Sequence, residues 1–251
     1  MVVQTVFICL TFSLIGYLCG SVLFGAIIAK MTNINVREIG SQNVGGTNVS
    51  RALGKKIGIL VSLLDAIKSY LAIIFCWIIF RYSIFDWDAN SSNLYWTIYL
   101  AGVFTVVGHC WPLLYLFKLF KTKFNRALAK AKSGGKGVAT SGGVLFAMSP
   151  WLGLLSFGIF VVILLITRYV SISSTICMFM PAFSVFLVGM DYFYLFDHSL
   201  LFQTSFEPDI VERVIFMVMI LCNSLIVIIR HIPNIIRLSK HEEKKVFHGK
   251  V

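Results

Sequence analysis

Residues 138–167 read VATSGGVLFAMSPWLGLLSFGIFVVILLIT, a stretch of 30 residues without a single charge. A transmembrane helix needs about 20 consecutive apolar residues, so this stretch is longer than one span requires. Ser149 and Pro150 fall near its middle, and proline disrupts the interior of a helix. We therefore predict two helices here, a short one over residues 138–148 and a membrane-spanning one over residues 151–167.

Apolar runs dominate the rest of the chain as well. Of its 251 residues, 58% are hydrophobic and 13% are charged, which is about half the charged fraction of a typical soluble domain. This composition excludes a soluble enzyme, a disordered chain and a disulfide scaffold, and it predicts an all-α, polytopic integral membrane protein that forms a single domain over residues 1–251. The other runs long enough to span are residues 3–28, 57–80, 94–116, 172–190 and 214–229.

The charges between these runs predict the orientation of the spans. Lys and Arg number five in residues 30–56, seven in residues 118–136 and six in residues 230–251, whereas residues 81–93 and 190–213 together hold seven of the 11 acidic residues. Basic loops face the cytoplasm. With the split at Ser149-Pro150, the pattern predicts seven transmembrane helices, one of them short, an external N-terminus and a cytoplasmic C-terminus. These basic loops account for the net charge of +11. No nucleic-acid partner is therefore expected.

Asp65 and Lys68 are charged residues inside an expected span. Because they are three positions apart, they share a helix face and can pair. An ionisable pair inside the membrane is by default a hypothesis of function. The alternative, a structural ion pair near the cytoplasmic end of the span, stays open.

The first of three unusual polar segments, residues 40–51, reads GSQNVGGTNVSR. Its glycines expose backbone N–H groups and favour an anion-binding turn, and Arg51 adds a forked cation that suits phosphate. An ordinary turn between two spans is the alternative. The neutral side chains that can contribute hydrogen bonds are Ser41, Asn43, Thr47 and Asn48.

The second segment, residues 133–137, reads SGGKG and is followed by Thr140. It is typical of a phosphate-binding loop that enters a helix, where the helix dipole favours an anion. The spacing of a nucleotide-binding P-loop is absent. His109 lies upstream, in or beside the preceding span, and is either a structural hydrogen-bond donor or part of this site.

The third segment begins Arg230-His231-Ile232-Pro233-Asn234, directly after the last span. His231 can exchange a proton near neutral pH, and Asn234 shares its helix face if Pro233 does not break the turn. The alternative is a basic stop at the membrane surface. Together the three segments predict a site for a phosphorylated substrate beside lipid. No acidic cluster indicates a metal, and the absence of an HxxxxD motif argues against the acyltransferases that use a His–Asp pair as base.

In this order the segments resemble the three motifs of the bacterial acyl-phosphate–glycerol-3-phosphate acyltransferases, the PlsY family. Those motifs read approximately GSxxFG with GSGNxGATNxxR, then GHxFP with FKGGKGVAT, then RHxxNIxRL with a trailing acidic residue. The resemblance covers essentially the whole chain. The matching positions are residues 20–25, 40–51, 108–112 and 134–140, then Arg230-His231, Asn234-Ile235 and Arg237-Leu238, with Glu242 as the trailing acid.

The resemblance implies a seven-helix fold and a reaction. The family transfers a fatty acyl group from acyl-phosphate to the sn-1 hydroxyl of glycerol-3-phosphate, giving lysophosphatidic acid and inorganic phosphate, without a cofactor. A bacterial cell membrane and a cytoplasmic active site are then expected. The implied catalytic residues are Ser41, Arg51, Lys136, His231 and Asn234. The expected substrate- and phosphate-binding residues are Asn43, Gly45, Thr47, Asn48, His109, Gly134, Gly135, Gly137, Thr140 and Arg230.

The chain departs from the family pattern at several places. Gln42 and Gly46 replace the usual Gly and Ala of the first motif, and Trp111 replaces Phe in the second. An insertion of about fifteen residues, 119–133, splits the second motif, and five of its residues are Lys or Arg. We expect the insertion to form an interfacial amphipathic helix on the cytoplasmic side, or to dock the soluble enzyme that supplies acyl-phosphate; a solvated loop is the alternative.

Two other classes of protein compete with the acyltransferase. A membrane transporter of a small phosphate ester or anion would also use glycine breaks and a buried ion pair. Transporters place the site near the bilayer midplane and contain repeats, whereas the polar segments here share one predicted face and we find no repeat. A structural scaffold leaves both glycine-rich loops unexplained. The sequence therefore favours the acyltransferase.

Overall fold

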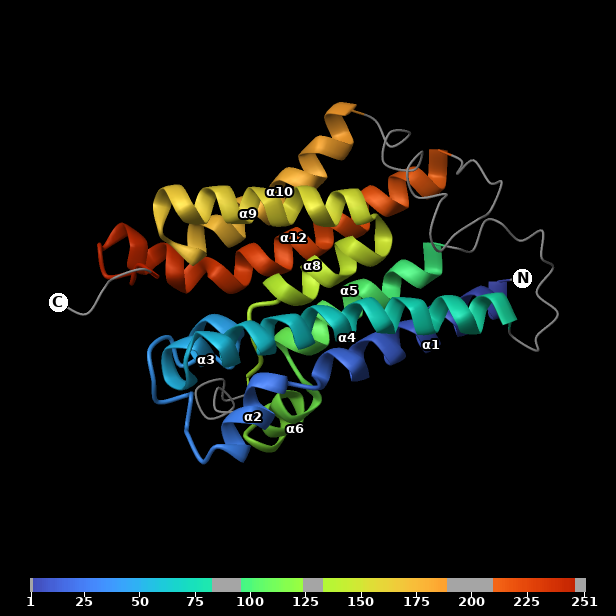
Figure 1. The fold of residues 1–251 in the computed structure, drawn as a ribbon. Helices are drawn as coiled ribbons and strands as arrows, with labels where there is room; N and C mark the ends of the chain where they lie inside the picture. Colours follow the sequence, from blue (N-terminus) through green and yellow to red (C-terminus); the bar gives the residue numbers. More distant parts are fainter. Residues whose placement is uncertain (1, 83–95, 124–132, 189–209, 247–251) are drawn as a thin grey trace. The chain divides into compact units, whose positions relative to one another are not determined.

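The computed structural model describes residues 2–82, 96–123, 133–188 and 210–246, and all regular secondary structure in these ranges is α-helical (Figure 1). The all-α class is thus confirmed. The helices are α1 (Val2–Ser21), α2 (Phe24–Met31), α3 (Gly46–Leu53), α4 (Lys55–Tyr82), α5 (Trp96–Cys110), α6 (Leu113–Lys121), α8 (Val138–Met148), α9 (Pro150–Thr167), α10 (Val170–Val188) and α12 (Ile210–Ser239).

Several helices have the length and composition of membrane spans. Within the described ranges, four segments meet both criteria, and the pair α5 and α6, bent by 53°, makes a fifth if it is counted as one span. Helix α8 and the first part of α10 are apolar but shorter. The four segments are Val2–Met31, Lys55–Phe80, Pro150–Thr167 and Val214–Ser239. The count of seven spans and their orientation stay predictions.

The predicted break at Ser149-Pro150 is confirmed. Helix α8 ends at Met148 and α9 begins at Pro150, where the missing amide hydrogen of proline is not needed. The Ser149 hydroxyl accepts a hydrogen bond from the Leu152 amide at 3.4 Å and caps α9, as serine commonly does at this position.

Two expected spans are interrupted where the sequence pattern predicts continuous helix. The first breaks between α1 and α2, and the third breaks at Pro112, between α5 and α6. The Ser21 hydroxyl joins the two breaks, because it accepts from the Leu113 amide at 3.2 Å and donates to the Tyr17 carbonyl at 2.8 Å. The Tyr17 hydroxyl donates to the Trp111 carbonyl. Polar groups freed by one break are therefore satisfied by the other.

The chain divides into two compact units, residues 1–144 and 145–251; the single functional domain stays a prediction. In the first unit, α1, α4 and α5 pack side by side (Figure 1). A side chain at Gly16 or Gly20 of α1 would overlap the backbone of α5 at Ala101 or Thr105. Small residues permit such close approach between membrane helices.

In the second unit, α10 contacts both α9 and α12. The Ser156 hydroxyl of α9 donates to the Cys177 carbonyl at 2.7 Å, and the Ser224 hydroxyl of α12 donates to the Met178 carbonyl. The chain then returns after α12, where the Val246 amide donates to the Arg168 carbonyl at 2.9 Å. The last of these bonds attaches the chain that follows the third polar segment to Arg168, at the end of α9.

The amphipathic helix expected within residues 119–133 lies largely outside the described residues. Helix α6 ends at Lys121, and residues 124–132 belong to the part that the structure does not describe. Helix α6 exposes Leu114, Phe117 and Phe120, which suits contact with lipid. The role of the insertion stays a prediction.

Candidate functional site

A small hydrophobic cluster holds the first glycine-rich segment in place. Val36 and Val44 of the loop pack with Val49 of α3 and Val61 of α4, and all four are buried. Burying such side chains stabilises the fold by about 1.5–3 kcal/mol each. The apolar positions around the segment therefore fix the loop, while its polar groups remain available.

Asn48 organises the backbone of this loop. Its amide nitrogen donates to the carbonyls of Val36 and Asn43, both at 2.8 Å, and its oxygen accepts from the Ser41 amide at 2.9 Å. Asn48 is buried, so these bonds form away from water, where leaving them unmade is expensive. Its side-chain contacts thus shape the loop around Ser41.

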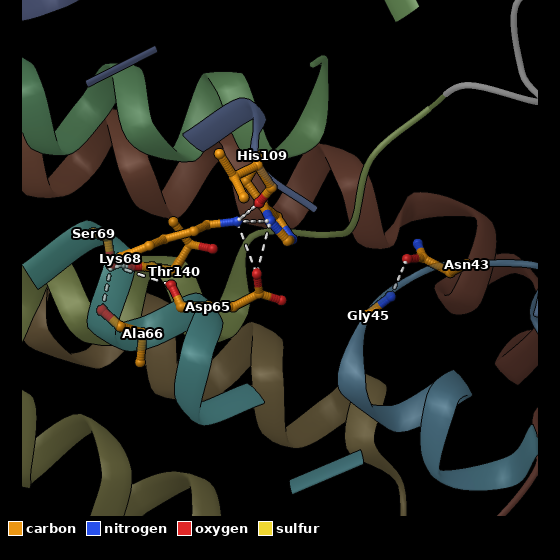
Figure 2. Close-up of polar contacts among 9 residues, drawn as sticks. Asn43, Gly45, Asp65, Ala66, Lys68, Ser69, His109 and Thr140 are labelled. Atoms are coloured by element: carbon orange, nitrogen blue, oxygen red, sulfur yellow. Dashed lines mark hydrogen bonds and ion pairs between the residues drawn. The ribbon is translucent and has the colours of Figure 1, made fainter. Parts of the chain in front are cut away.

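The remaining polar groups of the segment are more accessible. Ser41 and Asn43 are half-buried, whereas Thr47 and Arg51 are exposed. The Asn43 side-chain oxygen accepts from the Gly45 amide at 2.9 Å, just before α3 begins (Figure 2). Residues 40–51 thus combine a helix N-terminus, two hydroxyls and an accessible guanidinium, which together can bind an anion.

Gln42 adopts a left-handed conformation, with φ of 58°, at the position where the PlsY family pattern has glycine. This conformation costs a non-glycine residue roughly 1–2 kcal/mol, although glycine loses more entropy on folding. We expect Gln42→Gly to raise the thermal midpoint of the solubilised protein by about 2–4 °C, which corresponds to about 1 kcal/mol.

Asn33→Gly is the matched control for this prediction. Asn33 also has a positive φ, 54°, but asparagine tolerates this region better than glutamine. Its gain in thermal midpoint should therefore be smaller. A midpoint lowered by Gln42→Gly would show that the Gln42 side chain stabilises the loop.

The second glycine segment is attached to the end of α5. The Gly134 amide donates to the Cys110 carbonyl at 3.2 Å, and the Gly135 amide donates to the His109 carbonyl at 3.1 Å. A Cβ at Gly135 would overlap the His109 ring at Nε2, and one at Gly134 would overlap the His109 carbonyl. The close approach of this loop to His109 thus requires glycine at both positions. It places the half-buried Lys136 two residues before the start of α8.

A buried polar cluster lies on the other side of His109. Figure 2 shows the Lys68 ammonium between Asp65 and His109, at 2.8 Å from Asp65 Oδ1 and 2.9 Å from His109 Nδ1. The predicted Asp65–Lys68 pair is therefore confirmed. The Ser69 hydroxyl donates to the Thr140 carbonyl at 2.8 Å, so α4 contacts both helices that flank the glycine loop.

The first turn of α8 carries two buried hydroxyls. Thr140 and Ser141 are 0% and 1% exposed. Among the described residues, neither side-chain oxygen has a hydrogen-bond partner. Buried hydroxyls are normally paired, so this turn has unused hydrogen-bonding capacity beside the glycine loop. The sequence indicated Thr140 but missed Ser141, whose spacing matched no motif.

In the second unit, His231 is buried at 2% exposure. Its Nδ1 lies 2.8 Å from the Val227 carbonyl. Because a carbonyl only accepts, Nδ1 carries the proton, and in the neutral ring the lone pair lies on Nε2. His231 is therefore held in a form that can accept a proton. Arg230, its neighbour, is half-buried.

Helix α12 continues through Pro233 to Ser239, so Asn234 follows His231 by one helical turn. The Asn234 amide nitrogen donates to Glu243 Oε1 at 2.7 Å, and Arg237 Nε donates to Glu243 Oε2 at 2.9 Å. The carboxylate that contacts the third motif is therefore that of Glu243, the neighbour of Glu242, which the family pattern matched as the trailing acid. The Asn234 oxygen is buried, without a partner among the described residues.

The structure thus gathers the predicted site residues into two groups. Residues 40–51, His109 and residues 134–140 lie in the first unit, whereas Arg230, His231 and Asn234 lie in the second. Both groups offer cations and neutral donors. Among the described residues, no group of three or more His, Cys, Asp or Glu is placed to hold a metal ion. The chemistry of these donors suits an anionic, phosphorylated ligand.

The sequence profile described as glycerol-3-phosphate acyltransferase matches residues 10–241. The chain belongs to the glycerol-3-phosphate acyltransferase family. The glycerol-3-phosphate acyltransferases of Malacoplasma penetrans and Mycoplasma pneumoniae are 38% and 35% identical to it. Those alignments cover 96% and 94% of this chain and 94% of each relative.

Solved structures of the same family resemble this acyltransferase. Two crystal structures of PlsY, an integral membrane glycerol 3-phosphate acyltransferase, were determined in a glycerol 3-phosphate form and a lysophosphatidic acid form. Their TM-scores are 0.70 and 0.68, at 31% and 30% identity, and 94% of each chain is covered. The protein is accordingly an acyltransferase embedded in the membrane. Of the three classes that the sequence left in competition, the family membership supports the acyltransferase and not the transporter or the scaffold.

Proposed function

We propose that this acyltransferase uses acyl-phosphate as its donor and the sn-1 hydroxyl of glycerol-3-phosphate as its acceptor. The products are lysophosphatidic acid and inorganic phosphate. The observation that carries the proposal is the glycine loop before α8, attached to α5 through His109 and Cys110. Lys136 accompanies it, together with the hydroxyls of Thr140 and Ser141, which have no hydrogen-bond partner among the described residues. This donor set suits phosphate.

The proposed reaction needs little covalent help from the protein. The acceptor hydroxyl oxygen attacks the acyl carbonyl, the bond from that carbon to the phosphate oxygen breaks, and the electron pair leaves with phosphate. Phosphate is a good leaving group, so the protein mainly positions two anions and stabilises the developing oxyanion. Lys136 and Arg51 are the cations for this task, and Ser41 is a neutral donor in the same segment as Arg51.

The hydroxyl proton has two proposed destinations. His231 Nε2 can accept it, because Nδ1 already donates to the Val227 carbonyl and holds the ring in the suitable tautomer. A substrate phosphate oxygen can accept it instead. Asn234, whose buried side-chain oxygen has no partner in the part of the chain that the structure describes, is proposed to orient a hydroxyl of the acceptor. In both routes, the proton count balances without a cofactor.

The proposal places the site at the cytoplasmic face of a bacterial cell membrane. The basic segments before α4, around α6 and after α12 support this orientation through the positive-inside rule. A soluble enzyme would then deliver acyl-phosphate from the cytoplasm, while the acyl chain and the product remain in the bilayer.

The test uses the purified protein in lipid nanodiscs with glycerol-3-phosphate and palmitoyl-phosphate. Phosphate release and lysophosphatidic acid are measured together, with acyl-CoA and acyl carrier protein donors in parallel. We expect turnover with acyl-phosphate and equal amounts of both products. Turnover with a different donor alone would contradict the proposed donor and leave the acyltransferase assignment intact.

A further inference from the structure

Lys68 is a buried lysine with a complete set of hydrogen-bond acceptors. Its Nζ lies 2.6 Å from the Val22 carbonyl, 2.8 Å from Asp65 Oδ1 and 2.9 Å from His109 Nδ1. An ammonium has three donors and no acceptor, so three acceptors match its charged form. The Phe24 ring, with its centroid 5.8 Å away, also faces the cation.

An ionised Asp65 requires a charged partner, and Lys68 is the cation in contact with it. Asp65 is 3% exposed and Lys68 is 8% exposed. A buried carboxylate without a compensating cation is strongly destabilising, by about 3–5 kcal/mol. A neutral Lys68 would leave that carboxylate uncompensated at 2.8 Å. The ammonium form therefore agrees with both the hydrogen-bond count and the charge balance.

The tautomer of His109 follows from this arrangement. Because the ammonium has no lone pair, His109 Nδ1 must accept the hydrogen bond from Lys68. Asp65 Oδ1 lies 3.6 Å from Nδ1, too far to receive a hydrogen bond from it. The proton of the neutral ring is then on Nε2, the atom that faces Gly135.

Resting on the proposed phosphate-binding role of the glycine loop, we infer that Lys68 is a positioning residue for that loop. Lys68 fixes His109 as the Nε2–H tautomer and thereby aims a hydrogen-bond donor at the glycine loop where Gly135 faces the ring. The backbone carbonyl of His109 also accepts a hydrogen bond from the Gly135 amide at 3.1 Å. The Asp65–Lys68 ion pair in α4 thus orders the glycine loop through His109. The Val22 carbonyl, which accepts from Lys68, connects this cluster to the break after α1.

Solid-state ¹⁵N NMR of histidine-labelled protein in bilayers tests the tautomer directly, with His109→Gln to assign the signal. We expect His109 Nε2 to be protonated and Nδ1 unprotonated in the wild type. A protonated Nδ1 would overturn the inference. This measurement does not require turnover, so it stands even if the proposed acyl donor is wrong.

Kinetics separate positioning from stability. Lys68→Met leaves Asp65 as an unpaired buried charge, whereas Asp65→Asn/Lys68→Met removes both charges together. We expect the double variant to recover the thermal midpoint lost in the single one. The kcat/KM of the double variant should stay about 10–100-fold below wild type, which is the usual effect of losing a residue that orients a metal-ligating histidine in other proteins. The double variant should also lose the fixed Nε2–H tautomer.

Lys56→Met is the matched control, because Lys56 is an exposed lysine near the start of the same helix. It should leave both kcat/KM and the His109 signal unchanged. A folded double variant with wild-type kcat/KM would overturn the positioning role. So would a double variant that keeps the wild-type tautomer, because Lys68 would then not determine it.

Discussion

Lys136→Ala is expected to lower kcat for acyl transfer by about 10²–10³-fold, the usual effect of removing one preorganised donor to a developing anion. Lys136 stands between two buried glycines at the entrance to α8, where its ammonium adds to the partial positive charge of the helix N-terminus. The assay follows phosphate release from palmitoyl-phosphate in nanodiscs.

The loss should occur without unfolding. Lys136 is half-buried, and the loop amides of Gly134 and Gly135 bond to α5 independently of its side chain. Circular dichroism and the thermal midpoint should therefore match the wild type. Lys121→Ala, at an exposed lysine that ends α6, is the control and should keep full activity. Wild-type turnover in Lys136→Ala would refute the proposed site.

Local signals in the sequence predicted much of the fold. The break at Ser149-Pro150 was predictable because a serine cap and a first-turn proline are local chemistry. The Asp65–Lys68 pair was predictable because a spacing of three places both on one helix face. The breaks at Ser21 and Pro112 were missed, because hydropathy continues across them and their hydrogen bonds join residues 92 positions apart.

The candidate site shows the same limit. The sequence placed Gly135 and His109 in one motif, but it contained no signal that Lys68 would bond to that histidine from another helix. It matched Glu242 to the trailing acid of the third motif but contained no signal that the Glu243 carboxylate would bond to Asn234 and Arg237. After α12 the chain turns through His241, with φ of 57°, and the Glu242 amide bonds back to the Arg237 carbonyl. That reversal directs Glu243 toward Asn234, and it depends on backbone geometry that residue spacing does not reveal.

Gly135→Ala is expected to abolish most acyl transfer, with a loss at least as large as that of Lys136→Ala. The added methyl group would overlap the His109 ring, which is buried and bonded to Lys68 at 2.9 Å. The ring cannot swing away without breaking that bond, so the loop must move instead. A displacement of about 1 Å in a positioning element can cost roughly 10²-fold in rate. The measurement is kcat/KM for both substrates.

Gly142→Ala provides the matched control. Gly142 lies seven residues after Gly135, within α8. Apart from its chain neighbours and the nearby backbone of its own helix, no described atom lies within 4 Å of a Cβ at this position. Alanine in a helix interior is favoured over glycine by about 0.5–1 kcal/mol. Gly142→Ala should thus keep its activity and raise the thermal midpoint slightly, whereas Gly135→Ala loses activity. If Gly135→Ala retained wild-type kcat/KM, the loop would tolerate displacement from His109. The attachment of the glycine loop to α5 would then not control catalysis, and the positioning role inferred for Lys68 would lose its physical basis.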